Sequence, residues 1–214
     1  MAGVRDENAG MFISGISEDD AQGEVADYYA GQRKGWGFLP NYAAAFSTRP
    51  DVARAWNELN LAVRGGMDRR RFEIATIAAA RARRSTYCTA AHSTFLRDVC
   101  GDESAMEAIA EHPDGAALRD EDRAVYTFAT KVATDAAAVD QADVDALRAV
   151  GLSDADVADV VFAASARLFF TAVLDGLGAQ LDEQTAQTFA PALLQSMVVG
   201  RPVAVNPGSA GSAG

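Results

Sequence analysis

Apolar residues recur at intervals of three and four along almost every patterned segment of this chain, and many of them are alanine. Such spacing gathers the apolar side chains on one face of an α-helix, whereas a strand needs strict alternation, which no segment shows convincingly. The most apolar example is DADVADVVFAASARLFFTAVLDGLG, residues 154–178. The sequence therefore predicts an all-α bundle, and 214 residues are enough for a single domain with a proper core.

Capping and breaking residues set the expected helix ends. Ser17, Asp68 and Ser153 are predicted N-caps, Pro50 suits a first helical turn, and Pro191 should break the last helix. Helices are expected over 17–31, 42–46, 50–63, 68–84, from 86 onward, within 101–115, and over 120–138, 142–150, 153–178 and 182–198.

Three parts are expected along the chain. Residues 1–15 form an N-terminal extension, 16–200 the domain, and 201–214 a flexible tail ending in the linker-like NPGSAGSAG, whose native origin is open. Residues 66–84 and 151–169 both begin with glycine, an apolar residue and a cap, and continue as an alanine-rich helix. Whether the bundle consists of two diverged helical repeats stays open at this point.

The formal net charge of -11 argues against non-specific binding to nucleic acid, which depends on neutralising phosphates with Lys and Arg. The N-terminus lacks the pattern of a secretory signal, and no uninterrupted apolar run approaches the roughly 20 residues of a membrane span. Two cysteines do not make a disulfide scaffold. We expect a cytoplasmic protein that binds neither nucleic acid nor membrane.

The candidate chemistry lies in RRSTYCTAAHS, where Cys88 and His92 are spaced to share one helix face. If that helix starts at Ser85 or Thr86, its N-terminal dipole stabilises a Cys88 thiolate, and His92 can accept the thiol proton. The three arginines just before it could add positive potential: Arg81, Arg83 and Arg84. The competing interpretation is a small buried residue in an alanine-rich helix. One cysteine and one histidine are too few for a metal site, so none is expected.

The segment RRRFEIATIAAARARRSTYCTAAHS resembles the carboxymuconolactone decarboxylase and alkylhydroperoxidase D-like superfamily. The family motif is a glutamate, a Cys-x-x-Cys beginning twelve residues later, and a histidine four residues after the second cysteine. Glu73, Cys88 and His92 match it, but Ser85 replaces the first cysteine. Flanking segments resemble peroxidase-related members, so the resemblance covers roughly residues 16 to 185.

The resemblance implies a cofactor-free enzyme that assembles as a homotrimer or homohexamer. Cys88 would attack a hydroperoxide, with His92 as immediate base and Glu73 completing the proton relay. Without the resemblance, Glu73 is better interpreted as an exposed helix residue paired with Arg69 or Arg70. Ser85 and Tyr87 are expected at the edge of the pocket as binding residues.

Geometry adds a condition to this relay. A continuous helix would hold Glu73 about 22 Å from Cys88, so the chain must reverse between them, most plausibly at RRST. Cys100 lies about 18 Å beyond Cys88 on an unbroken helix, too far for a disulfide, and is interpreted as a packing residue. Ser85 cannot resolve a sulfenic acid; it is also simply a good N-cap.

Three functions remain open at this stage. The first is a one-cysteine peroxidase with an external thiol as reductant. The second is a non-redox acid–base enzyme, such as a decarboxylase, lyase or isomerase of a small organic acid, in which His92 and a carboxylate move protons and Ser85 orients the substrate. The third is a non-catalytic oligomeric binding protein.

Overall fold

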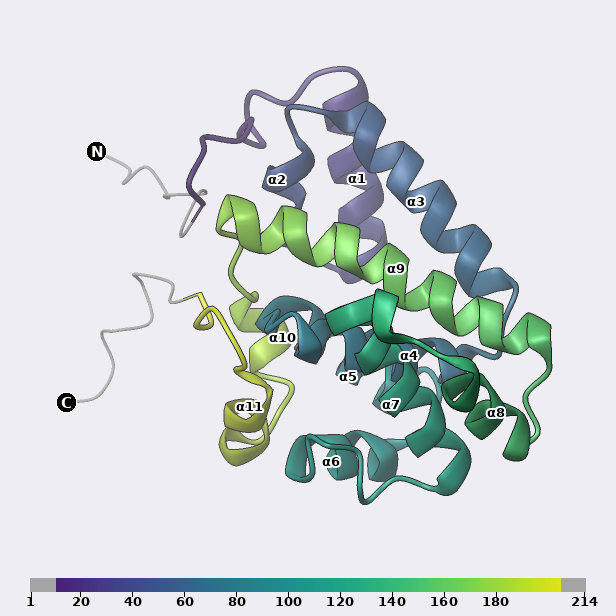
Figure 1. Cartoon of the computed structure of the whole chain (residues 1–214). Helices are drawn as coiled ribbons and strands as arrows, with labels where there is room; N and C mark the ends of the chain where they lie inside the picture. The colour runs from purple at the N-terminus through teal and green to yellow at the C-terminus, as the bar shows by residue number, and fades with distance from the viewer. Residues whose placement is uncertain (1–10, 205–214) are drawn as a thin grey trace.

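The computed structural model describes residues 11–204, and within that range every regular element is a helix. The predicted all-α class is therefore confirmed. Figure 1 shows the order of the elements, which are α1 (Glu24–Trp36), α2 (Ala43–Phe46), α3 (Pro50–Gly65), α4 (Arg69–Ala82), α5 (Thr86–Asp98), α6 (Glu103–Glu111), α7 (Asp120–Asp135), a 3-10 turn (Ala136–Ala138), α8 (Gln141–Ala149), α9 (Asp154–Leu177), α10 (Glu183–Ala186) and α11 (Pro191–Met197).

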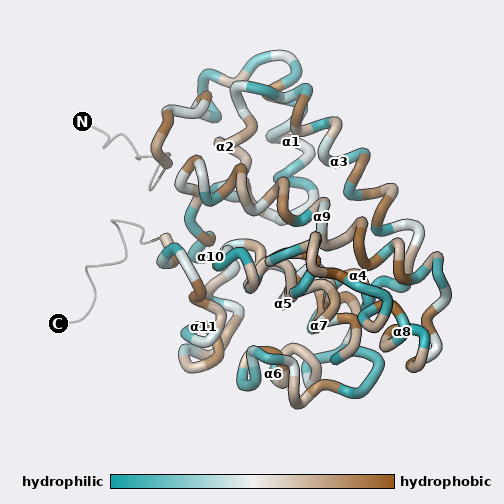
Figure 2. The backbone as a smooth tube through the Cα atoms, in the orientation of Figure 1, coloured by the Kyte–Doolittle hydropathy of each residue, from teal (hydrophilic) through white to brown (hydrophobic). Residues whose placement is uncertain are grey.

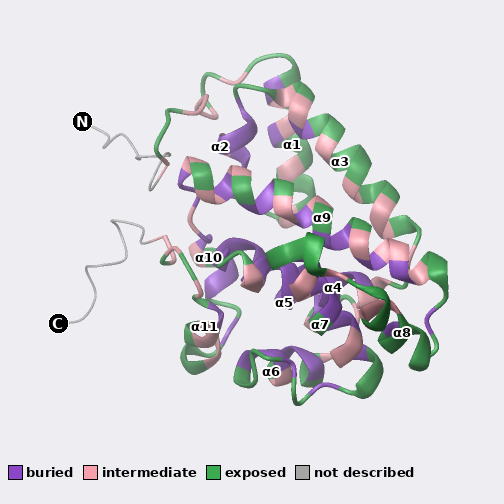
Figure 3. Ribbon diagram, viewed as in Figure 1, coloured by how far each residue is buried: buried purple, intermediate pink, exposed green. Residues whose placement is uncertain are grey.

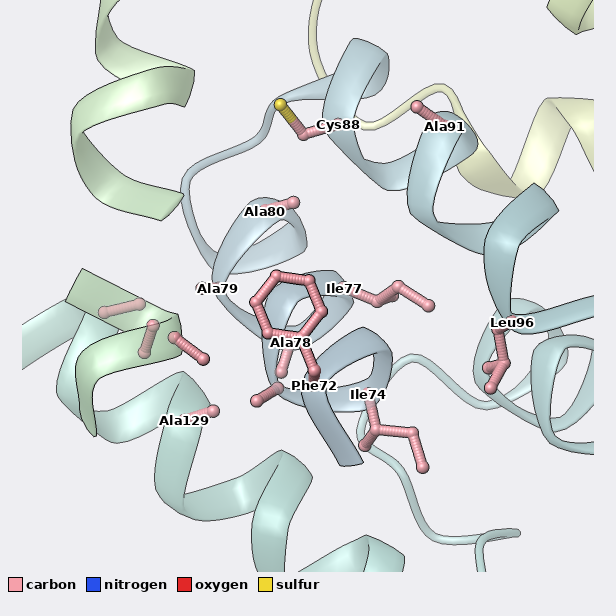
Figure 4. Close-up of a cluster of buried hydrophobic side chains, with 14 of the residues drawn as sticks. Phe72, Ile74, Ile77, Ala78, Ala79, Ala80, Cys88, Ala91, Leu96 and Ala129 are labelled. Atoms are coloured by element: carbon pink, nitrogen blue, oxygen red, sulfur yellow. The ribbon is translucent and has the colours of Figure 1, made fainter. Parts of the chain in front are cut away.

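Helix α4 is the centre of the bundle, with α5, α7 and α9 packed around it. Every residue from Phe72 to Ala80 is buried, as Figure 3 shows for this part of the ribbon. A helix buried on all sides needs small side chains where neighbours approach, and α4 supplies alanines there (Figure 4). The abundance of alanine therefore reflects close helix packing.

The chain reverses between α4 and α5, as the distance between Glu73 and Cys88 on a continuous helix required. Arg84 has a left-handed backbone (φ 58°), an uncommon conformation for a residue other than glycine. The amide of Arg84 donates to the carbonyl of Arg81, and the amide of Ser85 donates to the carbonyl of Ala80, both at 2.9 Å. This pair of bonds is a Schellman motif, which ends one helix and turns the chain into the next.

Helix α9 crosses the molecule between α1–α3 and the α4–α8 segment (Figure 1). It is long and apolar enough to span a membrane by length and composition alone. It contacts α3, α4 and α7 and contributes many buried hydrophobic residues to the core, although Phe162 and Phe169 on it are exposed (Figure 2). Ser153 caps it through a capping box with Asp156, as predicted for Ser153.

Other predicted boundaries meet mixed outcomes. Asp68 caps α4 by accepting from the Arg71 amide, and Pro191 begins α11 after a break. Ser17 was expected to cap the first helix, which is wrong: its hydroxyl caps only a turn at Asp20, and α1 begins at Glu24. The Ser17 segment has too few apolar residues to hold a longer helix on the core.

A run of arginines such as Arg69–Arg70–Arg71 is usually exposed to solvent, but here all three side chains pair with carboxylates. Arg70 pairs with Asp102 and with the buried Asp122, and Arg71 pairs with Asp156 and Glu121. Acidic residues from three other parts of the chain therefore converge on the start of α4. They are Asp102, Glu121, Asp122 and Asp156. Sequence spacing could not show that convergence.

The ends of the chain lie partly outside the described residues. Residues 1–10 of the predicted extension and 205–214 of the predicted tail, including all of NPGSAGSAG, are not described. Residues 201–204 pack on the domain: Arg201 donates to the carbonyl of Asp175 at 2.6 Å, and the Ala204 amide donates to the carbonyl of Leu181 at 2.9 Å.

Two leucines test this core. Leu174 on α9 is fully buried, whereas Leu61 on α3 is 45% exposed. Leu174→Ala should lower the free energy of unfolding by about 2–5 kcal/mol because it leaves a cavity. Leu61→Ala should change it by less than about 0.5 kcal/mol. Urea unfolding followed by circular dichroism measures both; equal losses would contradict this description of the core.

Candidate active site

Glu73 is a carboxylate with no exposed surface in the middle of α4. Arg69 Nε donates to Oε1 at 2.5 Å, and His92 Nδ1 lies 2.5 Å from Oε2. Burial alone would raise the pKa of Glu73, but His92 and Arg69 outweigh it and hold that pKa below its usual range. The predicted pairing with Arg69 is correct, and the predicted exposure is wrong.

His92 is neutral at physiological pH. Burial, reinforced by the positive charge of Arg167, lowers its pKa to about 4, although Glu73 opposes this. Since Glu73 is an anion, the Nδ1 hydrogen of the neutral ring donates to it. The lone pair then resides on Nε2, so Glu73 selects the tautomer in which His92 can act as a base.

Cys88 lies in the first turn of α5, as predicted, and is 1% exposed. The positive charge beside it comes from Arg167 of α9, whose Nη1 lies 3.8 Å from Sγ. The arginines that precede Cys88 in sequence face elsewhere: Arg81 donates to the carbonyl of Ser196, and Arg84 donates to that of Val199. The prediction that these neighbours supply the potential is wrong.

Arg167 is itself 3% exposed, an uncommon position for a guanidinium. It stacks near the rings of Trp56 and Phe170, at 5.6 and 5.3 Å from their centroids. Its Nε has no hydrogen-bond partner, and within residues 11–204 its one hydrogen bond goes to the Cys88 sulfur. An arginine cannot lose its proton, so this buried cation lacks a counter-ion until Cys88 ionises.

The thiol is protonated at rest. Burial raises the pKa of Cys88, and Arg167 together with the nearby Ser85 hydroxyl only partly opposes that effect. Loss of the proton therefore needs a base in the same cavity, and His92 provides one.

Of the two residues expected at the pocket, Tyr87 lines the cavity and Ser85 does not. Ser85 is the N-cap residue of α5, but its side chain makes no capping bond and does not line the cavity. Tyr87 does line the cavity, and its hydroxyl donates to Asp182. The amide of Asn41 also donates to Asp182, at 2.6 Å, and burial raises the pKa of Asp182 to about 6. Tyr87 thus forms part of the cavity wall, and its hydrogen bond to the buried Asp182 fixes its position.

A cavity of about 180 Å³ joins Cys88, His92, Glu73 and Arg167. Its walls are largely aromatic, with rings from five helices and the loop before α2: Trp36, Tyr42, Trp56, Phe72, Phe95 and Phe170. These rings lie edge-to-face or stacked on one another, for example Trp56 on Phe170 at 4.9 Å. The cavity is suited to a small, flat, largely apolar molecule.

The sequence analysis did not identify Arg167 or the aromatic lining residues such as Trp36 and Tyr42. A lone arginine inside the most apolar helix was the available signal for Arg167. Cys100 is half-buried just beyond α5 and does not line the cavity. Among residues 11–204 no three His, Cys, Asp or Glu side chains gather as metal ligands do.

The depressed pKa of His92 predicts acid sensitivity. Its pKa is lower in the folded state than in the unfolded state, where it is about 6.5. The folded state is therefore favoured above pH 6.5 and loses that advantage as the pH falls towards 4, by about 3 kcal/mol. His92→Gln, which can still donate to Glu73, should remove that part of the pH dependence. Urea unfolding of both proteins between pH 7 and 4 measures it, and parallel curves would contradict the assignment.

The role of Arg167 predicts the reactivity of Cys88. Arg167→Gln should raise the apparent pKa for alkylation of Cys88 by about 1–3 units, because the thiolate loses its nearest cation. Arg84→Gln is the matched control and should leave that pKa unchanged. Iodoacetamide labelling across pH, quantified by mass spectrometry of the Cys88 peptide, gives both values. A shift of the Cys88 pKa in Arg84→Gln but not in Arg167→Gln would mean that the arginines preceding Cys88 in sequence stabilise its thiolate.

Comparison with known proteins agrees with this architecture. The fold is similar to an AhpD-core, peroxidase-related protein from Ralstonia eutropha JMP134 (TM-score 0.73, 22% identity, covering 83% of this chain and 94% of that one). It is also similar to a peroxidase-related protein from Silicibacter sp. TM1040 (TM-score 0.69, 19% identity, 83% and 93%). A third similar structure is a cysteine-to-alanine variant of the debrominase Bmp8 in complex with 2,3,4-tribromopyrrole (TM-score 0.71, 18% identity, 89% and 99%).

The comparison with curated proteins finds no significant match. Residues 50–114 match the model of the Carboxymuconolactone decarboxylase family. That segment runs from α3 to α6 and contains Glu73, Cys88 and His92. Residues 50–114 are therefore similar to the carboxymuconolactone decarboxylase family, and the chain as a whole has an AhpD-like helical fold.

Proposed function

We propose that this protein is a one-cysteine, peroxidase-like oxidoreductase that reduces a small organic hydroperoxide with an external thiol. The observation that carries the proposal is the buried contact between Arg167 and Cys88. A buried cation whose one hydrogen bond goes to a sulfur is favourable when that sulfur becomes an anion. The arrangement therefore suits a reaction that passes through a Cys88 thiolate.

The first half-reaction oxidises Cys88. His92 Nε2 takes the thiol proton, directly or through one water, and Arg167 stabilises the thiolate. The sulfur attacks the terminal oxygen of the hydroperoxide; an S–O bond forms and the O–O bond breaks. The leaving alkoxide takes the proton from His92 and departs as an alcohol. Cys88 gains a hydroxyl and is oxidised by two electrons, and the hydroperoxide is reduced by two.

The second half-reaction restores the thiol. An external thiol attacks the sulfenic sulfur, releasing water and forming a mixed disulfide with Cys88. A second external thiol attacks that disulfide, which returns Cys88 and leaves the two reductants joined. An external reductant is invoked because Ser85 holds the position of the motif's other cysteine and Cys100 does not line the cavity.

Glu73 acts through His92. It holds Nδ1 protonated and so keeps Nε2 free to accept a proton. Its negative charge also stabilises the imidazolium that exists between the two proton transfers. The likeness to two peroxidase-related structures supports this proposal at the level of the fold.

A second candidate is acid–base chemistry without a redox step, such as decarboxylation or isomerisation of a small organic acid. The neutral, oriented His92 favours it, because proton transfer beside a carbonyl needs only that base. It gives no role to the contact between Arg167 and the Cys88 sulfur, which is why we rank it second.

Stoichiometric oxidation tests the first candidate. The reduced protein is mixed with one equivalent of tert-butyl hydroperoxide and dimedone at pH 7.5. Mass spectrometry should find the adduct on Cys88, and dithiothreitol without dimedone should restore the thiol. His92→Gln should slow formation of the adduct by about 10²–10⁴-fold because the base is lost. Cys100→Ala is the matched control and should react like the unaltered protein.

Two results would decide against the peroxidase. One is a Cys88 that stays reduced under these conditions while remaining open to alkylation. The other is turnover of an organic acid that persists in Cys88→Ala and is lost in His92→Gln, which would establish acid–base chemistry instead.

A further inference from the structure

Three polar residues of α3 line the cavity beside its aromatic walls. Asn57, Asn60 and Arg64 follow one another at spacings of three and four, so they lie on one face of the helix. Ala53, one turn before Asn57, lines the cavity on the same face. The cavity therefore has a polar side that the relay of Glu73, His92 and Cys88 does not use.

The charges in this cavity do not balance. Three of its residues are arginines. Arg69 is neutralised by Glu73, and Arg167 is opposite the sulfur that becomes an anion. Arg64 is half-buried, and it makes no hydrogen bond or ion pair within the described part of the chain. Five of the described arginines have no carboxylate partner, and of these five only Arg64 and Arg167 line the cavity.

Asn57 and Asn60 share this property. Neither side-chain amide has a hydrogen-bond partner among residues 11–204. Each amide offers two N–H donors, and the guanidinium offers a planar pair that matches the two oxygens of a carboxylate. The three side chains together form a site for a single negative charge, since one cation is uncompensated.

We propose that Asn57, Asn60 and Arg64 bind the carboxylate of the substrate, and that the substrate is an aromatic acid of one ring. This proposal rests on the proposed function in one respect only, namely that the reacting group of the acid is a hydroperoxide. The ring would lie between the aromatic walls, with its carboxylate on α3 and its reactive group at Cys88.

The size of the cavity supports one ring. An apolar cavity of about 150 Å³ can hold a benzene molecule. The cavity here is about 180 Å³, which leaves room for a ring and short substituents. The lining supplies aromatic rings such as Trp56 and Phe170 for stacking and Arg64 for charge recognition.

The test compares two unreactive probes of the same shape. Isothermal titration calorimetry at pH 7.5 measures the affinity of the protein for phenylacetate and for phenylacetamide, with no peroxide present. Phenylacetate should bind about tenfold more tightly or better, because a charged hydrogen bond to Arg64 contributes to one ligand alone. Both ligands should quench the fluorescence of the cavity tryptophans Trp36 and Trp56.

Variants assign the preference to α3. Arg64→Gln should bring the two affinities within about twofold, and Arg64→Lys should keep part of the difference. Asn60→Ala should weaken phenylacetate more than phenylacetamide. Arg54→Gln is the matched control, since Arg54 is exposed on the same helix, pairs with Glu24 and does not line the cavity. It should leave both affinities unchanged.

Equal affinity of the unaltered protein for the two probes would overturn the proposal, and so would a preference that survives in Arg64→Gln. Because the unaltered protein alone can give the first result, a variant that fails to fold does not decide the matter. A carboxylate preference without sulfenic acid at Cys88 would refute the peroxidase and leave this site standing. Peroxidase activity without a preference for the carboxylate would refute the carboxylate site and leave the peroxidase proposal standing.

Discussion

The buried carboxylate of Glu73 is the interaction on which the site depends. A charge at the centre of the most deeply buried helix is costly unless hydrogen bonds and opposite charge compensate it. Arg69 compensates one oxygen from the preceding turn of α4, and His92 compensates the other from α5. The second bond ties the register of α5 to that of α4. Because Cys88 lies one turn before His92, the same bond determines where the thiol is presented.

The reversal at Arg84 makes this bond possible. Arg84 adopts a left-handed backbone conformation that is unfavourable for a non-glycine residue, and this conformation folds α5 back along α4. Helix α9 then closes the site by bringing Arg167 against the Cys88 sulfur. The carboxylate, the thiol with its base, and the cation thus come from three helices that a single packed core holds together, which is why stability and reactivity are linked at this site.

Several features could be predicted from residues alone, and the failures have a common physical origin. Periodicity identified the helices, Asp68 and Ser153 were recognisable caps, and the separation of Glu73 and Cys88 required a hairpin. Contacts within a few residues of one another determined each of these. The errors concern partners distant in sequence: the acidic residues around the arginine run, the carboxyl that holds Tyr87, and the cation at Cys88.

The sequence by itself determined the all-α class, the family motif and the loss of its first cysteine at Ser85, because these depend on residue type and local spacing. Only the tertiary structure decided which arginine faces the thiol, that His92 is neutral, and that Arg64 of the cavity lacks an acidic partner. The physical reason is that burial and charge balance are set by what packs around a group, and here those neighbours come from helices far apart in the chain.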